Sequence, residues 1–136
     1  MTPYEQTAHD WLTRYGVIFG ATRRANKMPP WNRTPGQSKR QHWGVGLETS
    51  TGHRLTFDFF QSISATAKGE PVTAYDVLSC LASDVSLADM SPDDIAAEFG
   101  PMKPSEAYRC HAWGKRLAAF LAHLPDGAVA ALREIQ

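Results

Sequence analysis

The stretch that decides the fold is HWGVGLETSTGHRLTFDF, residues 42–59. On both sides of its centre, apolar residues alternate with small or polar ones. The alternating apolar residues are Trp43, Val45, Leu47, Leu55, Phe57 and Phe59. Successive side chains of a strand point to opposite faces, so each half puts its apolar residues on one face. Residues 49–52, TSTG, have the composition of a turn. The stretch therefore predicts a β-hairpin with one buried face.

Before the hairpin, the sequence predicts a helix and a third strand. Thr2 followed by Pro3 and Glu5 has the composition of a helix start with a capping box. An apolar stripe with helical spacing then extends to Gly16 through Tyr4, Ala8, Trp11, Leu12 and Tyr15. Residues 17–23, VIFGATR, are rich in strand formers. Together with the hairpin they predict a small three-stranded antiparallel sheet.

After the hairpin, the patterns are helical. Segments with start signals and apolar stripes begin at Thr73, Ser91, Pro104 and Asp126. The order of helix, strands and helices predicts an α+β fold, in which the sheet packs against the N-terminal helix and a C-terminal helical bundle. We expect one domain, 1–136. We expect its core to be Trp43, Leu55, Phe57, Leu78, Leu81, Trp113, Leu117 and Phe120.

The composition is that of a globular protein of a reducing cytosol. The chain is 43% hydrophobic and 21% charged, and it has no apolar run near the ~20 residues that a membrane span needs. Its first residues lack the layout of a secretion signal. Two cysteines are too few for a disulfide framework. Because Cys80 and Cys110 lie in apolar helical stripes, we expect both to be buried and unreactive.

Charge divides the chain into two halves. Residues 1–68 hold nine basic and four acidic residues, whereas residues 69–136 hold five basic and ten acidic ones. Residues 25–41 have three prolines and no periodicity, which predicts a long loop of the kind that is usually functional or mobile. In and beside this loop lie the basic and aromatic binding candidates Arg23, Arg24, Lys27, Trp31, Arg33, Lys39 and Arg40. The acidic candidates are Asp89, Asp93, Asp94 and Glu98.

These two sets allow different partners. Basic residues with aromatic neighbours suit a nucleic-acid backbone with stacked bases, and Trp and Arg equally suit a protein interface. An acidic surface suits a basic partner, including a channel that normally holds nucleic acid. The simpler explanations are a solvated loop and helix-dipole stabilisation by first-turn acids such as Asp93 and Asp94.

The sequence carries no recognisable pattern for catalysis or for metal binding. The sequence has no G-x-x-x-x-G-K-[ST] or G-x-S-x-G motif, and the G-x-G of Gly44 and Gly46 lies inside a predicted strand. The five histidines are scattered without ligand spacing. We therefore expect a protein that is not an enzyme and that has no cofactor and no metal.

Residues 41–121 resemble a family of small proteins that recurs in phage and prophage genomes. The resemblance rests on the segments HWGVGL, RLTFDFF, PVTAYDVLSCLASD, IAAEFG and PSEAYRC. It implies a phage accessory protein in the cytoplasm of a host bacterium, similar to anti-CRISPR inhibitors. The leading hypothesis is a non-enzymatic inhibitor that binds a bacterial protein or ribonucleoprotein complex, with a CRISPR effector favoured. The alternatives are a nucleic-acid-binding accessory protein, a phage assembly or structural factor, and a small enzyme.

Overall fold

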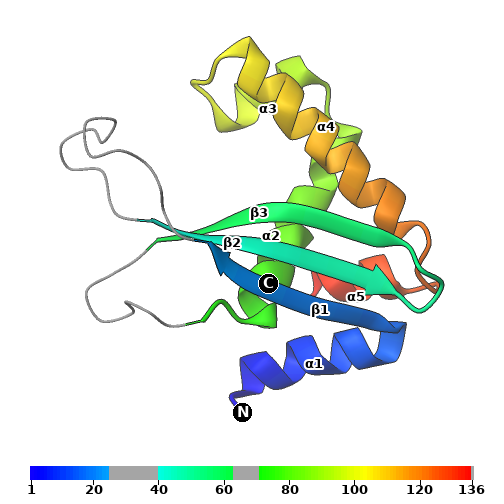
Figure 1. The fold of residues 1–136 in the computed structure, drawn as a ribbon. Coiled ribbons are helices and arrows are strands. Elements are labelled where there is room, and N and C mark those ends of the chain that lie inside the picture. Colours follow the sequence, from blue (N-terminus) through cyan, green and yellow to red (C-terminus); the bar gives the residue numbers. More distant parts are fainter. Residues whose placement is uncertain (25–39, 63–70, 136) are drawn as a thin grey trace.

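The structure is a computed structural model that describes residues 1–24, 40–62 and 71–135 (Figure 1). Its elements in chain order are α1 (Pro3–Tyr15), β1 (Val17–Arg24), β2 (Arg40–Thr49), β3 (Arg54–Ser62), α2 (Ala74–Asp84), the 3₁₀ helix η2 (Val85–Asp89), α3 (Pro92–Phe99), α4 (Pro104–Leu121) and α5 (Ala128–Arg133). The strands form one antiparallel sheet in the order β1-β2-β3. This confirms the predicted α+β fold and its three-stranded sheet.

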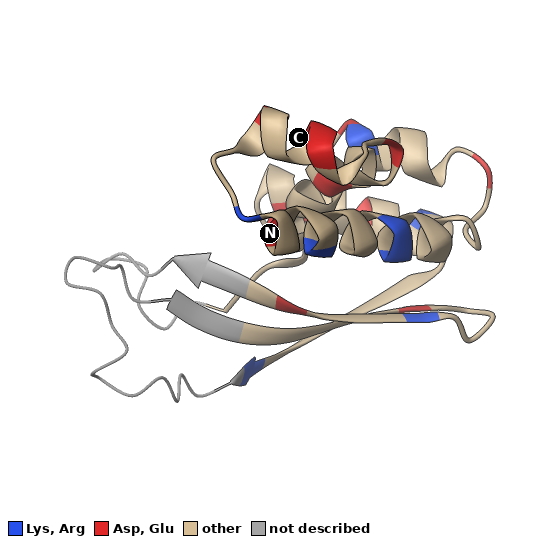
Figure 2. Ribbon diagram, turned by 90° about the horizontal axis from the view of Figure 1, so that it is seen from above, with Lys and Arg blue, Asp and Glu red and all other residues tan. Residues whose placement is uncertain are grey.

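The helices form a layer on one side of the sheet, and no helix of the described residues covers the other face, the open face (Figure 2). The register pairs Phe19 with Leu47 and Leu47 with Leu55, so the apolar alternation of the three strands coincides on the covered face. The opposite face carries Ile18, whose side chain is 67% exposed. In the described parts of the chain, no helix is long and apolar enough to cross a lipid bilayer.

Local sequence explains where the helices begin. At the start of α1, the Thr2 hydroxyl accepts a hydrogen bond from the Glu5 amide at 3.2 Å, while the Glu5 carboxylate accepts one from the Thr2 amide at 3.3 Å. Thr73 and Asp76 make the same reciprocal pair at the start of α2. These capping boxes satisfy amide groups that have no partner inside the helix. Gly16 ends α1 in the left-handed conformation, with φ of 66°.

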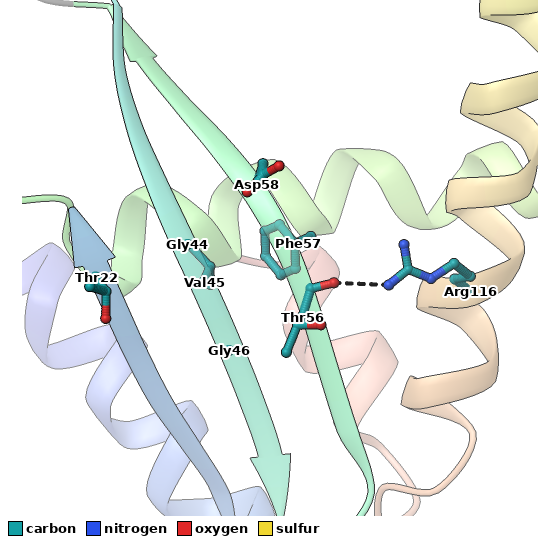
Figure 3. A pocket seen from close by; sticks show the side chains of 8 residues that line it. All are labelled: Thr22, Gly44, Val45, Gly46, Thr56, Phe57, Asp58 and Arg116. Atoms are coloured by element: carbon teal, nitrogen blue, oxygen red, sulfur yellow. Dashed lines mark hydrogen bonds between the residues drawn. The ribbon is translucent and has the colours of Figure 1, made fainter. Parts of the chain in front are cut away.

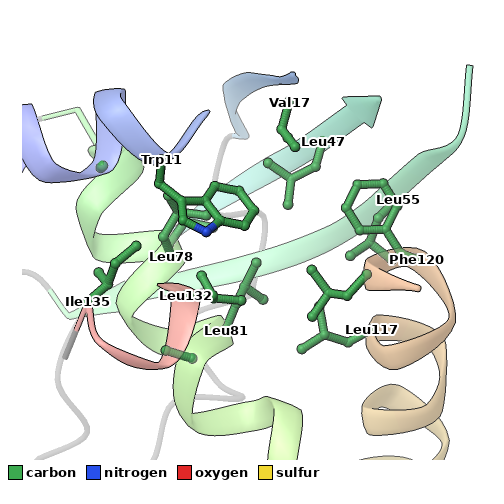
Figure 4. Close-up of a cluster of buried hydrophobic side chains, with 14 of the residues drawn as sticks. Trp11, Val17, Leu47, Leu55, Leu78, Leu81, Leu117, Phe120, Leu132 and Ile135 are labelled. Carbon is green, nitrogen blue, oxygen red and sulfur yellow. The ribbon is translucent and has the colours of Figure 1, made fainter. Parts of the chain in front are cut away.

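The main core lies between the sheet and α1, α2, α4 and α5 (Figure 4). Trp11 links α1 to α5, since its indole N–H donates a hydrogen bond to the carbonyl of Ala128 at 3.0 Å. The expected core residues that are buried are Trp43, Leu55, Leu78, Leu81, Leu117 and Phe120. Phe57 and Trp113 are half-buried at the edge of the same cluster. The predicted core is thus confirmed in its centre, and its two aromatic members at the edge border a cleft.

A smaller core holds η2 and α3 on α4. Leu87, Ile95 and Ala107 are its buried members. Gly114 of α4 is buried where this helix crosses η2, and a methyl group at this position would stand 2.7 Å from the Ala88 amide nitrogen and 2.7 Å from Cβ of Leu87. The glycine is therefore needed for the close approach of the two helices.

Replacing Gly114 by alanine should lower the free energy of unfolding by about 1–3 kcal/mol, because the added methyl overpacks the crossing. Alanine is otherwise the better helix former by about 1 kcal/mol. Urea denaturation of the variant and the wild type measures the difference. A more stable variant would mean that α4 and η2 do not approach as described.

The prediction that both cysteines are buried is wrong. Cys80 is exposed and Cys110 is half-buried. The buried face of α2 is formed by Val77, Leu78 and Leu81, and Cys80 lies at the margin of that stripe, where the helix borders a cleft. The low reactivity expected of the Cys80 thiol remains a prediction. Partial burial of the sulfur, followed by the negative charges of Asp84 and Asp76, raises the pKa of the Cys80 thiol.

Candidate functional site

Three glycines, Gly20, Gly44 and Gly46, lie at the centre of the open face of the sheet and form what we call the glycine floor. Gly20 of β1 pairs with Gly46 of β2, and Gly46 pairs in turn with Thr56 of β3. One step along, Thr22 pairs with Gly44. Side chains alternate along a strand, so these residues lie on the face opposite to the buried Leu47. The centre of the open face therefore exposes backbone in place of side chains.

A hollow of about 640 Å³ lies over this floor (Figure 3). It is lined by Thr22, Gly44, Val45, Gly46, Thr56, Phe57, Asp58 and Arg116. Two threonine hydroxyls, a carboxylate and a guanidinium thus surround exposed strand backbone. This combination offers hydrogen bonds of several kinds to a ligand that lies flat on the sheet.

Arg116 forms a wall of the hollow from outside the sheet. Its side chain extends from α4 to the edge strand β3, where one terminal nitrogen donates to the carbonyl of Thr56 at 2.8 Å (Figure 3). Its guanidinium also lies 5.6 Å from the ring centre of Trp113. These contacts hold a positive charge at the rim of the hollow and satisfy a carbonyl at the sheet edge.

Packing does not explain two of the glycines. A Cβ atom at Gly20 or at Gly46 would have no atom within 4 Å. Neither residue has the positive φ that favours glycine, as Gly16, Gly52 and Gly127 do. Glycine inside a strand weakens it, and it often marks a place where a ligand or another backbone approaches closely. A Cβ atom fits at both positions, so packing among the described residues does not require glycine there.

The structure locates only some of the predicted basic site. Arg23 is exposed near the end of β1, Arg24 ends that strand and Arg40 begins β2. The register pairs Arg23 with Trp43, so the three arginines belong to the same end of the sheet. Four of the predicted residues lie outside the described part of the chain. They are Lys27, Trp31, Arg33 and Lys39.

The predicted acidic residues lie on another part of the molecule. Asp89 is the last residue of η2, and Asp93, Asp94 and Glu98 belong to α3; all four are exposed. Asp94 has a local role, because its carboxylate accepts from the amide of Ser91 at 3.2 Å in a capping box. In the described part of the chain, the carboxylates of Asp89, Asp93 and Glu98 make no such hydrogen bond. The acidic set stays together on η2 and α3, which pack mainly on α4.

The glycine floor and Arg116 were not among the predicted site residues. A signal for the floor was present, because Gly20, Gly44 and Gly46 interrupt predicted strands at positions that the apolar alternation assigns to the outer face. For Arg116 no sequence signal exists, since its role depends on where α4 meets β3. In the described segments, no group of three or more His, Cys, Asp or Glu residues has metal-site geometry.

Comparison of the chain with known protein families, with characterised proteins and with solved structures finds no match.

Proposed function

We propose that this protein works by binding a macromolecular partner on the open face of its sheet. The observation that carries the proposal is the glycine floor, because Gly20 and Gly46 leave strand backbone accessible although the fold has room for side chains there. A partner that lies on this floor comes within reach of Thr22, Thr56 and Arg116. The exposed Ile18 adds apolar area on the same face. Apolar area beside directed polar groups is the usual make-up of an interface.

The partner we propose is a bacterial nucleic-acid-handling complex, which the protein inhibits in the manner of anti-CRISPR proteins. The separated charges support this choice. Arginines lie at one end of the sheet, and acidic residues lie on η2 and α3. A ribonucleoprotein offers complements to both, since it carries phosphates and basic channels that hold nucleic acid. Binding alone is enough for inhibition when the bound protein covers the surface with which the complex contacts nucleic acid.

A transformation assay tests this function. The protein is expressed in bacteria with an active CRISPR system, which is then challenged with a targeted plasmid and with an untargeted one. We expect the targeted plasmid to transform as well as the untargeted one, and a tagged copy of the protein to copurify with the effector. Unchanged interference in every CRISPR type tried, together with no nucleic-acid-handling component in the purified material, would contradict the proposal.

Direct binding of nucleic acid is a second candidate, and the arginines at one end of the sheet favour it. Fluorescence anisotropy with labelled single-stranded and double-stranded oligonucleotides separates it from the first. Direct phosphate contacts make affinity fall steeply with salt. Tight, salt-sensitive binding to the bare oligonucleotides would favour this candidate over protein binding.

Reversal of two acidic residues of α3 tests whether the acidic surface steers the partner. In the double variant Asp93→Lys, Glu98→Lys we expect association to slow about tenfold or more at low ionic strength, because steering depends on complementary potentials. The difference should shrink at high salt, where the Debye length falls to about 3 Å.

Asp94 is kept in this variant so that the capping box at the start of α3 stays intact. Surface plasmon resonance at several salt concentrations measures the rates. Equal association rates for the variant and the wild type would remove η2 and α3 from the interface and leave the sheet-face proposal untouched.

A further inference from the structure

A second concavity lies next to the hollow, at the edge strand β3. It is a cleft of about 380 Å³ between β3, α2 and α4. Its lining residues are Phe57, Asp58, Phe59, Cys80, Leu81, Asp84 and Trp113. Phe57 and Asp58 also line the hollow over the glycine floor, so the two concavities are neighbours along β3. A partner that lies on the sheet can therefore place a side chain in the cleft.

The walls of the cleft are aromatic. Phe57 and Trp113 are in contact, with ring centres 5.0 Å apart and ring planes at 51°, and Phe59 lines the same space. The faces of aromatic rings attract cations, and indole does so most strongly. The molecule contains an example, because the guanidinium of Arg116 lies 5.6 Å from the ring centre of Trp113. Among the described residues, no lysine or arginine lines the cleft.

The cleft also contains the carboxylate of Asp84, which has no ion-pair partner in the described part of the chain. One oxygen of Asp84 accepts a hydrogen bond from the indole N–H of Trp113 at 2.9 Å. Within the described residues, no lysine, arginine or histidine forms an ion pair with it. Burial raises the pKa of Asp84, and the bond from Trp113 opposes this only in part. A partly buried carboxylate without a counter-charge is unfavourable, and an incoming cation relieves the penalty.

We infer that this cleft binds the guanidinium group of an arginine side chain from the partner, an inference that rests on the proposed function. A planar guanidinium stacks on aromatic rings and donates two parallel hydrogen bonds to a carboxylate. Phe57, Phe59 and Trp113 supply the rings, and Asp84 supplies the carboxylate. A complex that handles nucleic acid exposes arginines for phosphate binding, so the cleft fits the same class of partner.

Binding in the cleft depends on pH with a definite sign. The guanidinium keeps its charge throughout, so the pH dependence comes from the cleft. Asp84 must be ionised to pair with it, and its raised pKa means that binding strengthens as the pH rises through that value. The other charged or titratable groups nearby are Asp58 of β3, Cys80 and Asp76 of α2, and Arg116 of α4. Cys80 stays a neutral thiol over this range, because its own pKa is raised.

A pair of small probes tests the inference without the partner. N-acetylarginine amide is titrated into the isolated protein, and its citrulline counterpart is the matched neutral control. NMR follows the indole N–H resonance of Trp113, assigned with a Trp113→Phe variant. We expect a saturable shift with the arginine probe, and affinity for the citrulline probe at least tenfold weaker.

The variant Asp84→Asn completes the test. Asparagine keeps an oxygen for the bond from Trp113 but removes the charge, so we expect at least a tenfold loss of affinity for the arginine probe and loss of the pH dependence. Alkylation of Cys80 by iodoacetamide, in a Cys110→Ala background, should slow when the arginine probe is bound. Equal binding of both probes, or unchanged affinity in Asp84→Asn, would overturn the inference. Because the partner is absent, that failure is distinct from failure of the sheet-face proposal.

Discussion

Replacing Leu81 by alanine should lower the free energy of unfolding by about 2–5 kcal/mol, a large part of the stability of a domain of this size. Leu81 is only 2% exposed and belongs to the cluster in which α2 meets the sheet and the other helices. The loss combines the transfer free energy of the removed methyl groups with the cost of the cavity that they leave. Urea denaturation, followed by circular dichroism, measures it.

Two further variants make this measurement specific. Tyr108 is 64% exposed on α4, so Tyr108→Ala should change the free energy of unfolding by less than about 0.5 kcal/mol. Phe57→Ala should cost less than Leu81→Ala, because Phe57 lies half-buried at the edge of the cluster. A loss below about 0.5 kcal/mol at Leu81 would contradict the packing of α2 described above.

The fold was predictable because its signals are local. The hairpin follows from an alternation of apolar residues around Val45 and Phe57, which only one face of a strand can satisfy. The helix starts follow from capping boxes whose members are three residues apart, as at Thr2 and Glu5. Such patterns fix the faces that are buried.

The concavities were not predictable because they depend on distant segments. Asp84 and Trp113 are 29 residues apart in sequence, and the cleft exists only where their helices meet β3. The wrong prediction for Cys80 has the same origin. The apolar stripe of a helix indicates its buried face, but it does not show whether a residue at the margin of the stripe is covered by a neighbouring element. The outer face of a strand is free of the constraint that burial imposes. Gly20, Gly44 and Gly46 therefore interrupt the strand pattern without indicating the hollow that lies over them.

Replacing Gly46 by valine should weaken partner binding at least 100-fold and leave the fold intact. The new side chain occupies the centre of the floor, where it prevents contact with the strand backbone. A Cβ atom at this position has no other atom of the described residues within 4 Å, so the fold has room for the start of a side chain there. Valine favours strands more than glycine does, so the free energy of unfolding should stay equal or rise by up to about 1 kcal/mol.

Two control variants isolate the effect of the floor. Gly46→Ala adds a single methyl and should weaken binding by an intermediate factor. Ala130→Val adds a branched side chain to an exposed site on α5, in the helix layer, and should leave affinity unchanged. Graded losses at Gly46 without loss at Ala130 would tie the effect to the open face of the sheet.

The dissociation constant of the partner complex in the Gly46→Val variant, measured against the wild type by isothermal titration calorimetry, tests the central claim most directly. If the partner binds the open face, the dissociation constant should rise at least 100-fold in Gly46→Val, while the free energy of unfolding stays at least as high as in the wild type. Wild-type affinity in a folded Gly46→Val variant would contradict it, since a partner in contact with the glycine floor cannot tolerate a branched side chain there.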